Sequence, residues 1–335
     1  MSKICVLGAG SWGIALAKLL ANNGNDVTVW SCIQAEIDML NEHHEHLDKL
    51  PGVKLPDSIT YTVNATEAME GAKIIVMAVP SPFVRSTAKQ VAKDVKDDQI
   101  IVNVAKGIEE STLTTLSSVI ESEIPNAKVA VLSGPSHAEE VGKDIPTVVA
   151  IGCADKEVAK TIQETFMNER FRVYISPDVL GIEIGAALKN VIALAAGMAD
   201  GIGFGDNTKA ALITRGMAEI TRLGIAMGGH AETFYGLSGI GDLIVTCASM
   251  HSRNRRAGIL IGQGKTMQEA MDEVKMVVEG VNSAKAALLL SQKYNVEMPI
   301  VNEVNKVLFE NKTAKDTVTD LMLRESKAEI TKDWN

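Results

Sequence analysis

The stretch that decides the fold is residues 3–13, which read KICVLGAGSWG. The short apolar run at its start is typical of a buried parallel strand, and it ends in glycines with the spacing G-x-G-x-x-G. Gly8 permits a tight turn, Gly10 lets the backbone approach a pyrophosphate, and Gly13 lets the following helix pack closely on the strand. The pattern predicts a dinucleotide-binding turn, and a glycine-rich turn without a ligand is the alternative.

The residues after this turn complete a strand–helix–strand unit. Apolar residues at helical spacing continue to Leu20 and predict a helix, which Gly24 is expected to end. The apolar residues at positions 27–30 predict the next strand. Free N–H groups and the helix dipole would then face a bound phosphate. The unit has the length that a dinucleotide fold requires, which favours the binding interpretation.

One element of the dinucleotide pattern is missing at the end of the second strand. Enzymes that use NAD usually place an acidic residue there to bind the ribose hydroxyls. This chain has Ser31-Cys32 at that position, Asp26 comes too early, and Glu36 belongs to the following segment. We therefore expect either NADP or NAD as the cofactor.

Length and composition exclude several classes of protein. The chain has 335 residues, enough for two domains, and its 46% hydrophobic and 22% charged residues are typical of soluble globular proteins. Acidic residues outnumber basic ones by 42 to 33, a net charge of -9, so we expect no nucleic-acid partner. No apolar run is expected to reach the roughly 18 residues of a membrane span, so we expect no membrane insertion.

Cysteines and histidines form no pattern of a metal site, and no metal is expected. The four cysteines lack a C-x-x-C pair, which argues against zinc or a disulfide framework and fits a reducing cytoplasm. The first strand begins too early for a signal peptide, which also favours a cytoplasmic location. The polar segment 41–49 contains three histidines, and we expect it to be a solvated helix or loop.

Apolar runs that alternate with helical patterns predict an α/β fold with a largely parallel, doubly wound sheet of Rossmann type. Ser111 is predicted to cap a helix that ends near Glu123, and after Pro177 helical periodicity dominates. We expect a Rossmann-type domain over residues 1–180 and an all-α domain over residues 181–335. The expected strands after the first two are 73–79, 100–104, 129–132, 147–151 and 171–175.

Several polar segments come directly after predicted strands. They are Pro80-Ser81, Lys106-Gly107 and Gly134-Pro135-Ser136. Ligands of doubly wound sheets bind outside the carboxyl ends of the strands, so the fold should bring these segments and the Gly8 turn to one edge. Lys106 is the charged residue among these segments, and we expect it either to bind a ligand or to be an ordinary surface lysine.

A lysine interrupts the most apolar helical segment of the chain. Residues 182–198 are nearly all small or apolar except around Lys189 and Asn190. A charge inside such a helix is costly unless it has a partner or a task, and the alternative is that its ammonium reaches solvent.

A glycine-rich loop and a basic segment follow later in the chain. Three glycines within 236–241 precede Asp242, and Arg253 and Asn254 follow a polar turn beside two more arginines. A guanidinium suits phosphate because its fork of N–H donors matches the oxygens. The alternative is a solvated basic helix end.

Together and in this order, these segments resemble the bacterial NAD(P)-dependent glycerol-3-phosphate dehydrogenase family over nearly the whole chain. The resemblance implies that the protein interconverts dihydroxyacetone phosphate and sn-glycerol 3-phosphate by hydride transfer with NAD(P)H, which supplies glycerol 3-phosphate for phospholipid synthesis. We expect a small phosphorylated substrate and a homodimer. The matching segments are 8–13, 105–107, 133–136, 187–190, 239–243, 252–254 and 277–280.

The same resemblance assigns roles to individual residues. It implies Lys189 as the catalytic proton acceptor. The residues that it places around the substrate are Lys106, Gly134, Ser136, Lys189, Asp242, Ser252, Arg253 and Asn254. Those that it places at the cofactor, besides Gly8, Gly10 and Gly13, are Ser11, Trp12, Lys106, Ala138, Arg253, Val277 and Glu279. The family often has an arginine just after the second strand, where this chain has Ser31-Cys32, so a 2′-phosphate would lack that partner.

The chemistry requires a proton donor and acceptor near neutral pH, and free lysine, with a pKa of ~10.4, is too basic. Burial and the neighbouring cation Lys106 would lower the pKa of Lys189, and we expect Asp242 to hold its ammonium. Two alternatives stay open at this point: a related Rossmann-plus-helical reductase of a β-hydroxy acid, and a non-catalytic nucleotide sensor. A sensor would have no need of both lysines.

Overall fold

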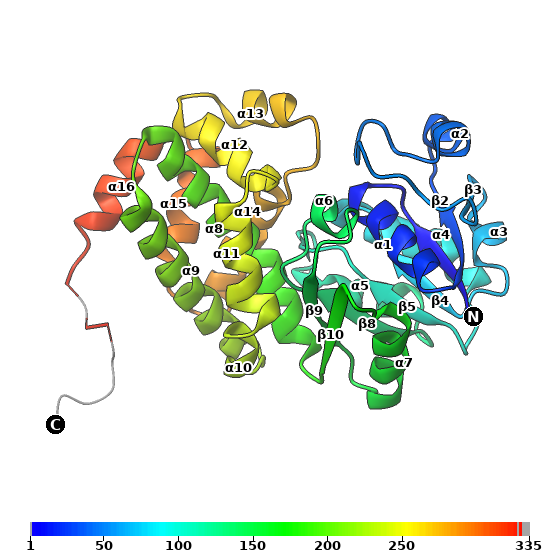
Figure 1. Cartoon of the computed structure of the whole chain (residues 1–335). Helices are drawn as coiled ribbons and strands as arrows, with labels where there is room; N and C mark the ends of the chain where they lie inside the picture. Colours follow the sequence, from blue (N-terminus) through cyan, green and yellow to red (C-terminus); the bar gives the residue numbers. More distant parts are fainter. Residues whose placement is uncertain (1, 327, 330–335) are drawn as a thin grey trace.

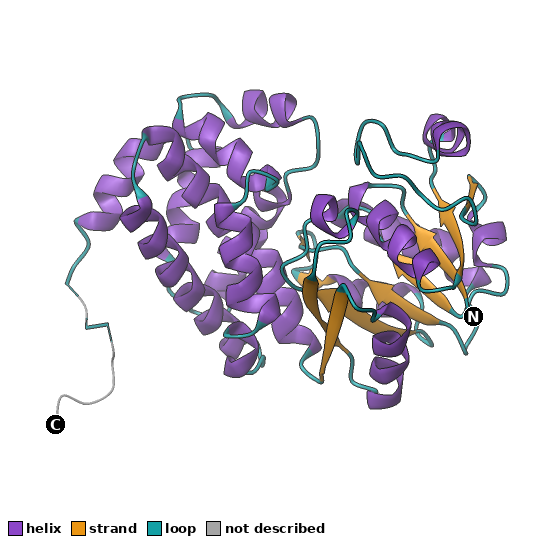
Figure 2. Ribbon diagram, in the orientation of Figure 1, coloured by secondary structure: helices purple, strands orange, loops and turns teal. Residues whose placement is uncertain are grey.

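The structure is a computed structural model that describes residues 2–326, 328 and 329. An N-terminal part with a sheet between layers of helices lies beside a C-terminal part made of helices (Figure 1; Figure 2). The last strand ends at Ser176 and the first helix of the second part begins at Val179. Residues 1, 327 and 330–335 lie outside the described residues.

Within the described residues, eight strands form one sheet in the order β10-β9-β8-β5-β4-β1-β2-β3. Strands β9 and β10 run opposite to the other six, which are all parallel. The predicted, largely parallel sheet is confirmed. The strands are β1 (Lys3–Leu7), β2 (Asp26–Trp30), β3 (Thr60–Thr62), β4 (Ile74–Met77), β5 (Ile100–Asn103), β8 (Lys128–Ser133), β9 (Thr147–Gly152) and β10 (Phe171–Ser176). The short edge strand β3 was not predicted, because its three residues are polar or only half-buried.

Helices cover both faces of the sheet, as the doubly wound prediction requires. Alternate residues of β1 point to opposite faces: Ile4 and Val6 belong to one apolar cluster, Cys5 and Leu7 to another. The first cluster includes residues of α1 (Ser11–Asn22), α6 (Ala138–Val141) and α7 (Lys156–Phe166). The second includes residues of α3 (Ala65–Met69), α4 (Val84–Val91) and α5 (Leu116–Glu123).

The C-terminal part is built around the long buried helix α8 (Val179–Ile202). Its other helices are α9 (Asp206–Ala226), α10 (Ala231–Phe234), α11 (Asp242–Ala248), α12 (Arg253–Gly262), α13 (Met267–Val274), α14 (Glu279–Lys293), α15 (Pro299–Phe309) and α16 (Ala314–Met322). Helices α8 and α12 approach closely: a Cβ at Gly197 would lie 2.2 Å from the Arg255 carbonyl oxygen, and one at Gly258 would lie 2.3 Å from that of Leu194. Only glycine permits this packing.

The helix predicted to start at Ser111 begins later, and that prediction is wrong. Thr115 is the N-cap of α5, and the preceding residues form a small antiparallel pair of β6 (Ile108–Glu109) and β7 (Thr114–Thr115). Leu113 turns the chain at φ 57°, with its N–H donating to the Glu109 carbonyl. This tight turn takes the residues that would otherwise form the first turn of a helix.

The prediction that no apolar run reaches membrane length is wrong for α8. Among the described residues, this helix alone is long and apolar enough to span a membrane, with a mean hydropathy of 1.7 over its best 18-residue window. However, 83% of that window is buried inside the protein. Its apolar surface is therefore used in packing against the other helices.

The histidine-rich segment 41–49 is less solvated than predicted. The side chain of His46 is only 1% exposed, and its Nδ1 accepts a hydrogen bond of 3.3 Å from the Lys49 N–H. No group of three or more potential metal ligands occurs in the part of the chain that the structure describes.

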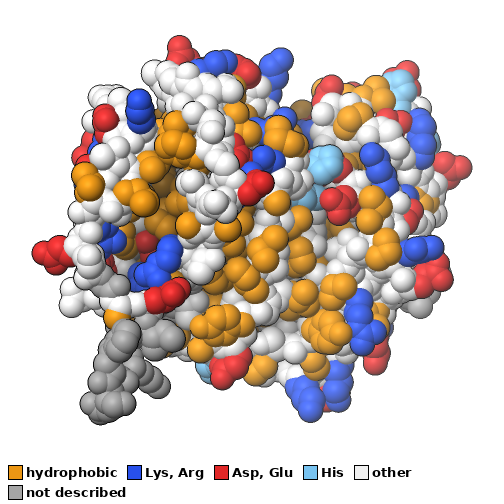
Figure 3. All heavy atoms as spheres, turned by 60° about the vertical axis from the view of Figure 1, so that its left-hand side comes forward, with side chains coloured by type: hydrophobic (Ala, Val, Ile, Leu, Met, Phe, Trp, Pro, Cys, Tyr) orange, Lys and Arg blue, Asp and Glu red, His pale blue; other side chains and the backbone are white. Residues whose placement is uncertain are grey.

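On the face drawn in Figure 3, basic side chains are interspersed with acidic ones.

Candidate active site between sheet and helices

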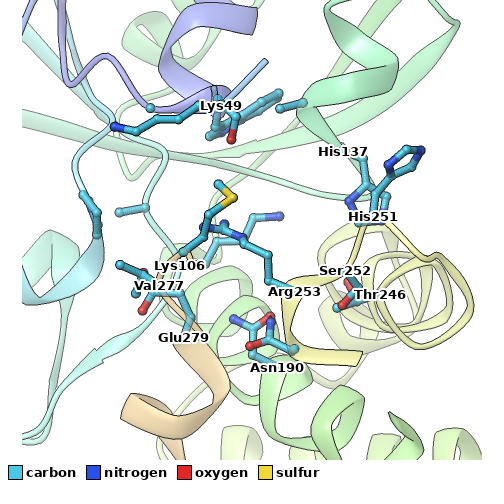
Figure 4. Close-up of a pocket in the computed structure, with 18 of the residues that line it drawn as sticks. Lys49, Lys106, His137, Asn190, Thr246, His251, Ser252, Arg253, Val277 and Glu279 are labelled. Atoms are coloured by element: carbon cyan, nitrogen blue, oxygen red, sulfur yellow. The ribbon is translucent and has the colours of Figure 1, made fainter. Parts of the chain in front are cut away.

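A cleft of about 830 Å³ lies between the sheet domain and the helices. Segments that follow β1, β4, β5 and β8 line one side, and α8, α11, α12 and the segment before α14 line the other. The carboxyl ends of the parallel strands therefore meet at this cleft, as the sequence predicts. Figure 4 shows side chains from both sides directed towards the common space.

The glycine turn has the geometry expected of a pyrophosphate cradle. Gly8 has a φ of 120°, and a Cβ there would lie 2.9 Å from the backbone of Ala78. A Cβ at Gly13 would lie 2.1 Å from the Gly8 carbonyl oxygen, whereas one at Gly10 would meet no atom within 4 Å. No side chain caps the N-terminus of α1. The turn thus leaves open space and uncapped backbone beside the cleft, which fits a dinucleotide.

Ser11 and Trp12, the first residues of α1, line the same cleft. The Trp12 indole nitrogen is buried and has no hydrogen-bond partner among the described residues. A buried donor without a partner is uncommon and favours a ligand that accepts from it.

The end of β2 holds an acidic side chain after all. Glu36, in the first turn of α2 (Gln34–His43), accepts a hydrogen bond of 2.6 Å from the Ser31 hydroxyl. The strand end itself carries Ser31-Cys32 and no acid, as the sequence shows, and the acid comes from the following segment. The Glu36 side chain extends from α2 back to the end of β2. The spacing of residues in the sequence does not indicate this contact.

Two lysines converge on one aspartate at the inner end of the cleft. Lys106, which follows β5, donates to Asp242 Oδ2 at 2.7 Å, and Lys189, in the middle of α8, donates to Asp242 Oδ1. Lys189 also donates to the Thr246 hydroxyl at 2.7 Å. The Asp242 side chain is 1% exposed, and that of Lys189 is 7% exposed. These residues are far apart in the sequence, and the prediction that Asp242 holds the Lys189 ammonium agrees with this geometry.

The charges in this cluster favour loss of a proton from Lys189. Burial lowers the pKa of Lys189 to about 7, and the positive charge of Lys106 acts in the same direction, while Asp242 opposes both. Burial raises the pKa of Asp242, but the two ammonium groups outweigh it and hold that pKa below its usual value. When Lys189 is neutral, Lys106 and Asp242 remain as a balanced ion pair. The cluster can therefore give and take one proton near neutral pH.

The loop after β8 supplies backbone oxygen and a hydroxyl. Gly134 has a φ of 143°, and its carbonyl accepts from Lys106 Nζ at 3.1 Å and from the Ser136 hydroxyl at 2.9 Å. Ser136 and Ala138 line the cleft. Gly134 thus positions Lys106 and Ser136 rather than presenting a free group.

Arg253, the first residue of α12, lines the cleft without an ion-pair or hydrogen-bond partner among the described residues. Figure 4 shows its side chain extending into the space between the two parts of the chain. Arginine presents a fork of N–H donors, and a half-buried fork without partners is suited to an oxyanion.

The neighbours of Arg253 have mainly positioning contacts. The Ser252 hydroxyl caps α12, accepting from the Arg255 N–H at 3.2 Å. The Asn254 amide donates to Asn190 Oδ1 at 2.9 Å, and its oxygen accepts from the Gly280 N–H at 2.8 Å. Asn254 therefore ties α8, α12 and α14 together, which the sequence pattern does not indicate.

Val277 and Glu279 complete the rim of the cleft on the helical side. The Glu279 carboxylate accepts from the backbone N–H of Ser81 at 3.1 Å and also from its hydroxyl. Ser81 follows β4, so this contact joins the two sides of the cleft.

Sequence reasoning omitted three residues from the site. Thr246 lies one helical turn after Asp242, a spacing that in retrospect indicates a shared partner. His137 lines the cleft, with its ring 5.8 Å from that of His251 across it, and its Nε2 is buried without a hydrogen-bond partner among the described residues. Asn190 was noticed beside Lys189 but given no role.

Comparison with known proteins identifies the family. Models of the N-terminus and the C-terminus of NAD-dependent glycerol-3-phosphate dehydrogenase match residues 3–159 and 178–319. The chain is 65% identical over 329 residues to the glycerol-3-phosphate dehydrogenase (NAD(P)+) of Agathobacter rectalis, covering 98% of each chain. It is 59% identical over 332 residues to that of Fusobacterium nucleatum, covering 98% of this chain and 99% of the relative.

Solved structures agree with this assignment. The crystal structure of glycerol-3-phosphate dehydrogenase from Coxiella burnetii matches with a TM-score of 0.93 and 34% identity, covering 96% of this chain and 99% of that one. D-mandelate dehydrogenase with NADH and anilino(oxo)acetate matches at a TM-score of 0.62 and 12% identity, covering 96% and 99%, which shows a common fold only. The fold and the resemblance predicted from the sequence are both confirmed, and the chain belongs to the NAD-dependent glycerol-3-phosphate dehydrogenase family.

Proposed function

We propose that the protein interconverts dihydroxyacetone phosphate and sn-glycerol 3-phosphate with NAD(P)H or NAD(P)+. The observation that carries the proposal is the pairing, in one cleft, of a lysine with a pKa near neutral and an arginine without a partner. The first suits proton transfer to a carbonyl oxygen, and the second suits a phosphate. The close relatives bear the name of this activity.

Lys189 is the group that exchanges the proton. In reduction its ammonium gives a proton to the C2 oxygen, and in oxidation its neutral amine accepts the hydroxyl proton. A bound nicotinamide supplies or accepts the hydride. Asp242 and Thr246 hold Nζ from two sides, so the amine keeps its position in both protonation states. The positive charge of Lys106 balances the negative charge of Asp242 whether Lys189 is protonated or neutral.

Arg253 fixes the substrate through its phosphate. It lies at the N-terminus of α12, where the helix dipole also favours an anion. Gripping the phosphate restricts the position of the reacting carbon relative to Lys189, which is how binding energy is converted into rate. Ser136 and Lys106 line the same cleft and would bind the remaining substrate oxygens.

The remaining assignments belong to the same proposal. Gly8, Gly10, Ser11, Trp12, Gly13, Ala138, Val277 and Glu279 would hold the cofactor, and Gly134, Ser252 and Asn254 would support the substrate site. We further propose a cytoplasmic homodimer that supplies glycerol 3-phosphate for phospholipid synthesis. We place the domain boundary near residue 180, at the start of α8.

The test is a steady-state assay of the purified protein. Dihydroxyacetone phosphate should drive oxidation of NADH or NADPH, followed by absorbance, whereas unphosphorylated dihydroxyacetone should react poorly. A panel of β-keto acids distinguishes the activity of a β-hydroxy-acid reductase. Turnover of a β-keto acid in preference to dihydroxyacetone phosphate would contradict the proposal, and so would cofactor binding without turnover of any carbonyl compound.

A further inference from the structure

One buried polar atom of the cleft has no part in the proposed proton transfer. His137 comes directly after Ser136 in the loop that follows β8, and it is the N-cap of α6 without a side-chain capping hydrogen bond. Its side chain lines the cleft, and its Nε2 is buried without a hydrogen-bond partner among the described residues. Buried polar atoms are rarely left unpaired, so this one favours a ligand group that pairs with it.

The His137 ring extends from the sheet domain to the helical side of the cleft. The ring of His251, in the turn between α11 and α12, has its centroid 5.8 Å away. Figure 4 shows these two side chains next to one another. The carbonyl of Val245, on α11, accepts a hydrogen bond from the His137 ring. The imidazole therefore lies against the helix whose Asp242 and Thr246 hold the amine of the proposed proton transfer.

The unpaired nitrogen of His137 is an acceptor. Burial lowers the pKa of His137, and the positive charge of Lys189 lowers it further. Glu139, Asp242 and the Val245 carbonyl act in the opposite direction, and the balance leaves the pKa below its usual value. The ring is therefore neutral at neutral pH and carries one proton. The hydrogen bond to Val245 places that proton on Nδ1, because Nε2 has no partner, so Nε2 presents a lone pair to the cleft.

The proposed substrate has one group that needs such an acceptor. The carbonyl oxygen and the phosphate of dihydroxyacetone phosphate accept hydrogen bonds, and Lys189 and Arg253 are donors suited to them. Its C1 hydroxyl also donates. Asp242 and the Gly134 carbonyl already accept from lysines. Nε2 of His137 is a buried acceptor that still lacks a donor.

We propose that Nε2 of His137 accepts a hydrogen bond from the C1 hydroxyl of dihydroxyacetone phosphate, and that His137 thereby selects this substrate over ketones that lack the hydroxyl. The proposal rests on the proposed function, because it states how one group of that substrate is recognised. A site that pairs with a hydroxyl rejects an analogue without it, since the buried acceptor then has no partner.

Two competing arrangements make different predictions. The Glu139 carboxylate also lines the cleft and competes for the same hydroxyl, but its residue is only half-buried, so water can satisfy it. Alternatively, the amide N–H of a bound nicotinamide pairs with Nε2 of His137. Loss of the imidazole would then weaken cofactor binding without substrate and slow the reduction of every ketone equally.

The test compares dihydroxyacetone phosphate with acetonyl phosphate, the same ketone without the C1 hydroxyl. His137→Phe keeps an aromatic ring and removes both nitrogens. It should lower kcat/KM for dihydroxyacetone phosphate roughly tenfold to 100-fold and leave that for acetonyl phosphate unchanged, so that the ratio of the two falls by the same factor. The ratio cancels the intrinsic reactivities of the ketones. His137→Gln retains a side-chain acceptor and should restore part of the ratio.

His230→Phe is the matched control, because His230 is also the N-cap of a four-residue helix, α10, without a side-chain capping hydrogen bond. Its residue is exposed and is not among those that line the cleft. This variant should leave both kcat/KM values unchanged. Thermal unfolding and titration of NADH fluorescence establish that each variant folds and binds cofactor.

Three results would overturn the proposal: equal losses for both ketones in a folded His137→Phe protein, an unchanged ratio in that variant, or a ratio that falls in Glu139→Gln but not in His137→Phe. In each of these cases turnover of dihydroxyacetone phosphate by the wild type leaves the proposed function intact. If the wild-type protein binds cofactor but reduces neither ketone, the proposed function fails and this proposal fails with it.

Discussion

Replacing Lys106 with methionine should move the pH dependence of the reaction without removing it. Lys106 and Lys189 bind the two oxygens of one buried carboxylate, so their charges repel each other across the cluster. Two unit charges about 4 Å apart interact by about 4 kcal/mol at an effective dielectric constant of about 20, so across the shared carboxylate this repulsion is roughly 3 kcal/mol, or roughly 2 pH units. Without it the protonated form of Lys189 is favoured, and its pKa rises.

The direction of the change follows from the role of the neutral amine. Oxidation of glycerol 3-phosphate requires neutral Lys189, so kcat/KM should rise with pH through a midpoint near the pKa of about 7. In Lys106→Met this ascending limb should move upward by roughly 2 pH units. The absolute rate should also fall, because Lys106 is proposed to contact the substrate, but the midpoint does not depend on that loss.

The assay is a series of initial rates of NAD+ reduction at fixed ionic strength, with saturating cofactor. Lys209→Met is the control, because Lys209 is exposed to a similar extent and also pairs with an aspartate, Asp200, outside the cleft. Its midpoint should equal that of the wild type. A midpoint in Lys106→Met that is unchanged or lower would refute the electrostatic reasoning. Loss of the limb in Lys106→Met and its survival in Lys189→Met would mean that the two lysines have exchanged roles.

The other predictions concern single groups of the same cleft. Lys189→Met should lower turnover by ~10²–10⁴ while cofactor fluorescence titrations stay normal, because the proton is lost and the glycine turn is untouched. Arg253→Lys keeps the charge but loses the fork, so KM for dihydroxyacetone phosphate should rise roughly 10-fold to 100-fold with little effect on unphosphorylated dihydroxyacetone; equal effects on both would indicate a structural role. Gly10→Val should abolish cofactor binding and leave the thermal unfolding temperature unchanged, because a Cβ there has free space in the protein but occupies the expected pyrophosphate position. Normal cofactor affinity in this variant would contradict the assignment of the glycine turn as the pyrophosphate site.

Local patterns were sufficient for those parts of the site in which one residue contrasts with its surroundings. Lys189 could be noticed because it interrupts an apolar helix, and the glycine turn because its spacing serves one backbone geometry. Lys106 followed from its place after a buried strand. In each case the signal lies within a few residues of the chain.

Contacts between distant segments could not be predicted in this way. Glu36 reaches the end of β2 because α2 begins close by and Lys49 neutralises its charge. The side-chain amide of Asn254 donates to Asn190 and accepts from the Gly280 N–H, and these residues are 64 and 26 positions away in the sequence. Such pairings depend on how helices and loops pack, and one sequence contains no direct sign of them.

The packing of α8 against α12 explains how the two halves of the proposed substrate site keep their relative position. Lys189 belongs to α8, and Arg253 begins α12. The helices touch through glycines four residues apart on each, with Gly201 and Gly262 repeating the close approach of Gly197 and Gly258. Because backbone meets backbone there, no flexible side chain separates the two helices. The relative position of the two helices is therefore set by main-chain contact, and these helices carry the amine that we propose transfers the proton and the guanidinium that we propose binds the phosphate, as oriented catalysis requires.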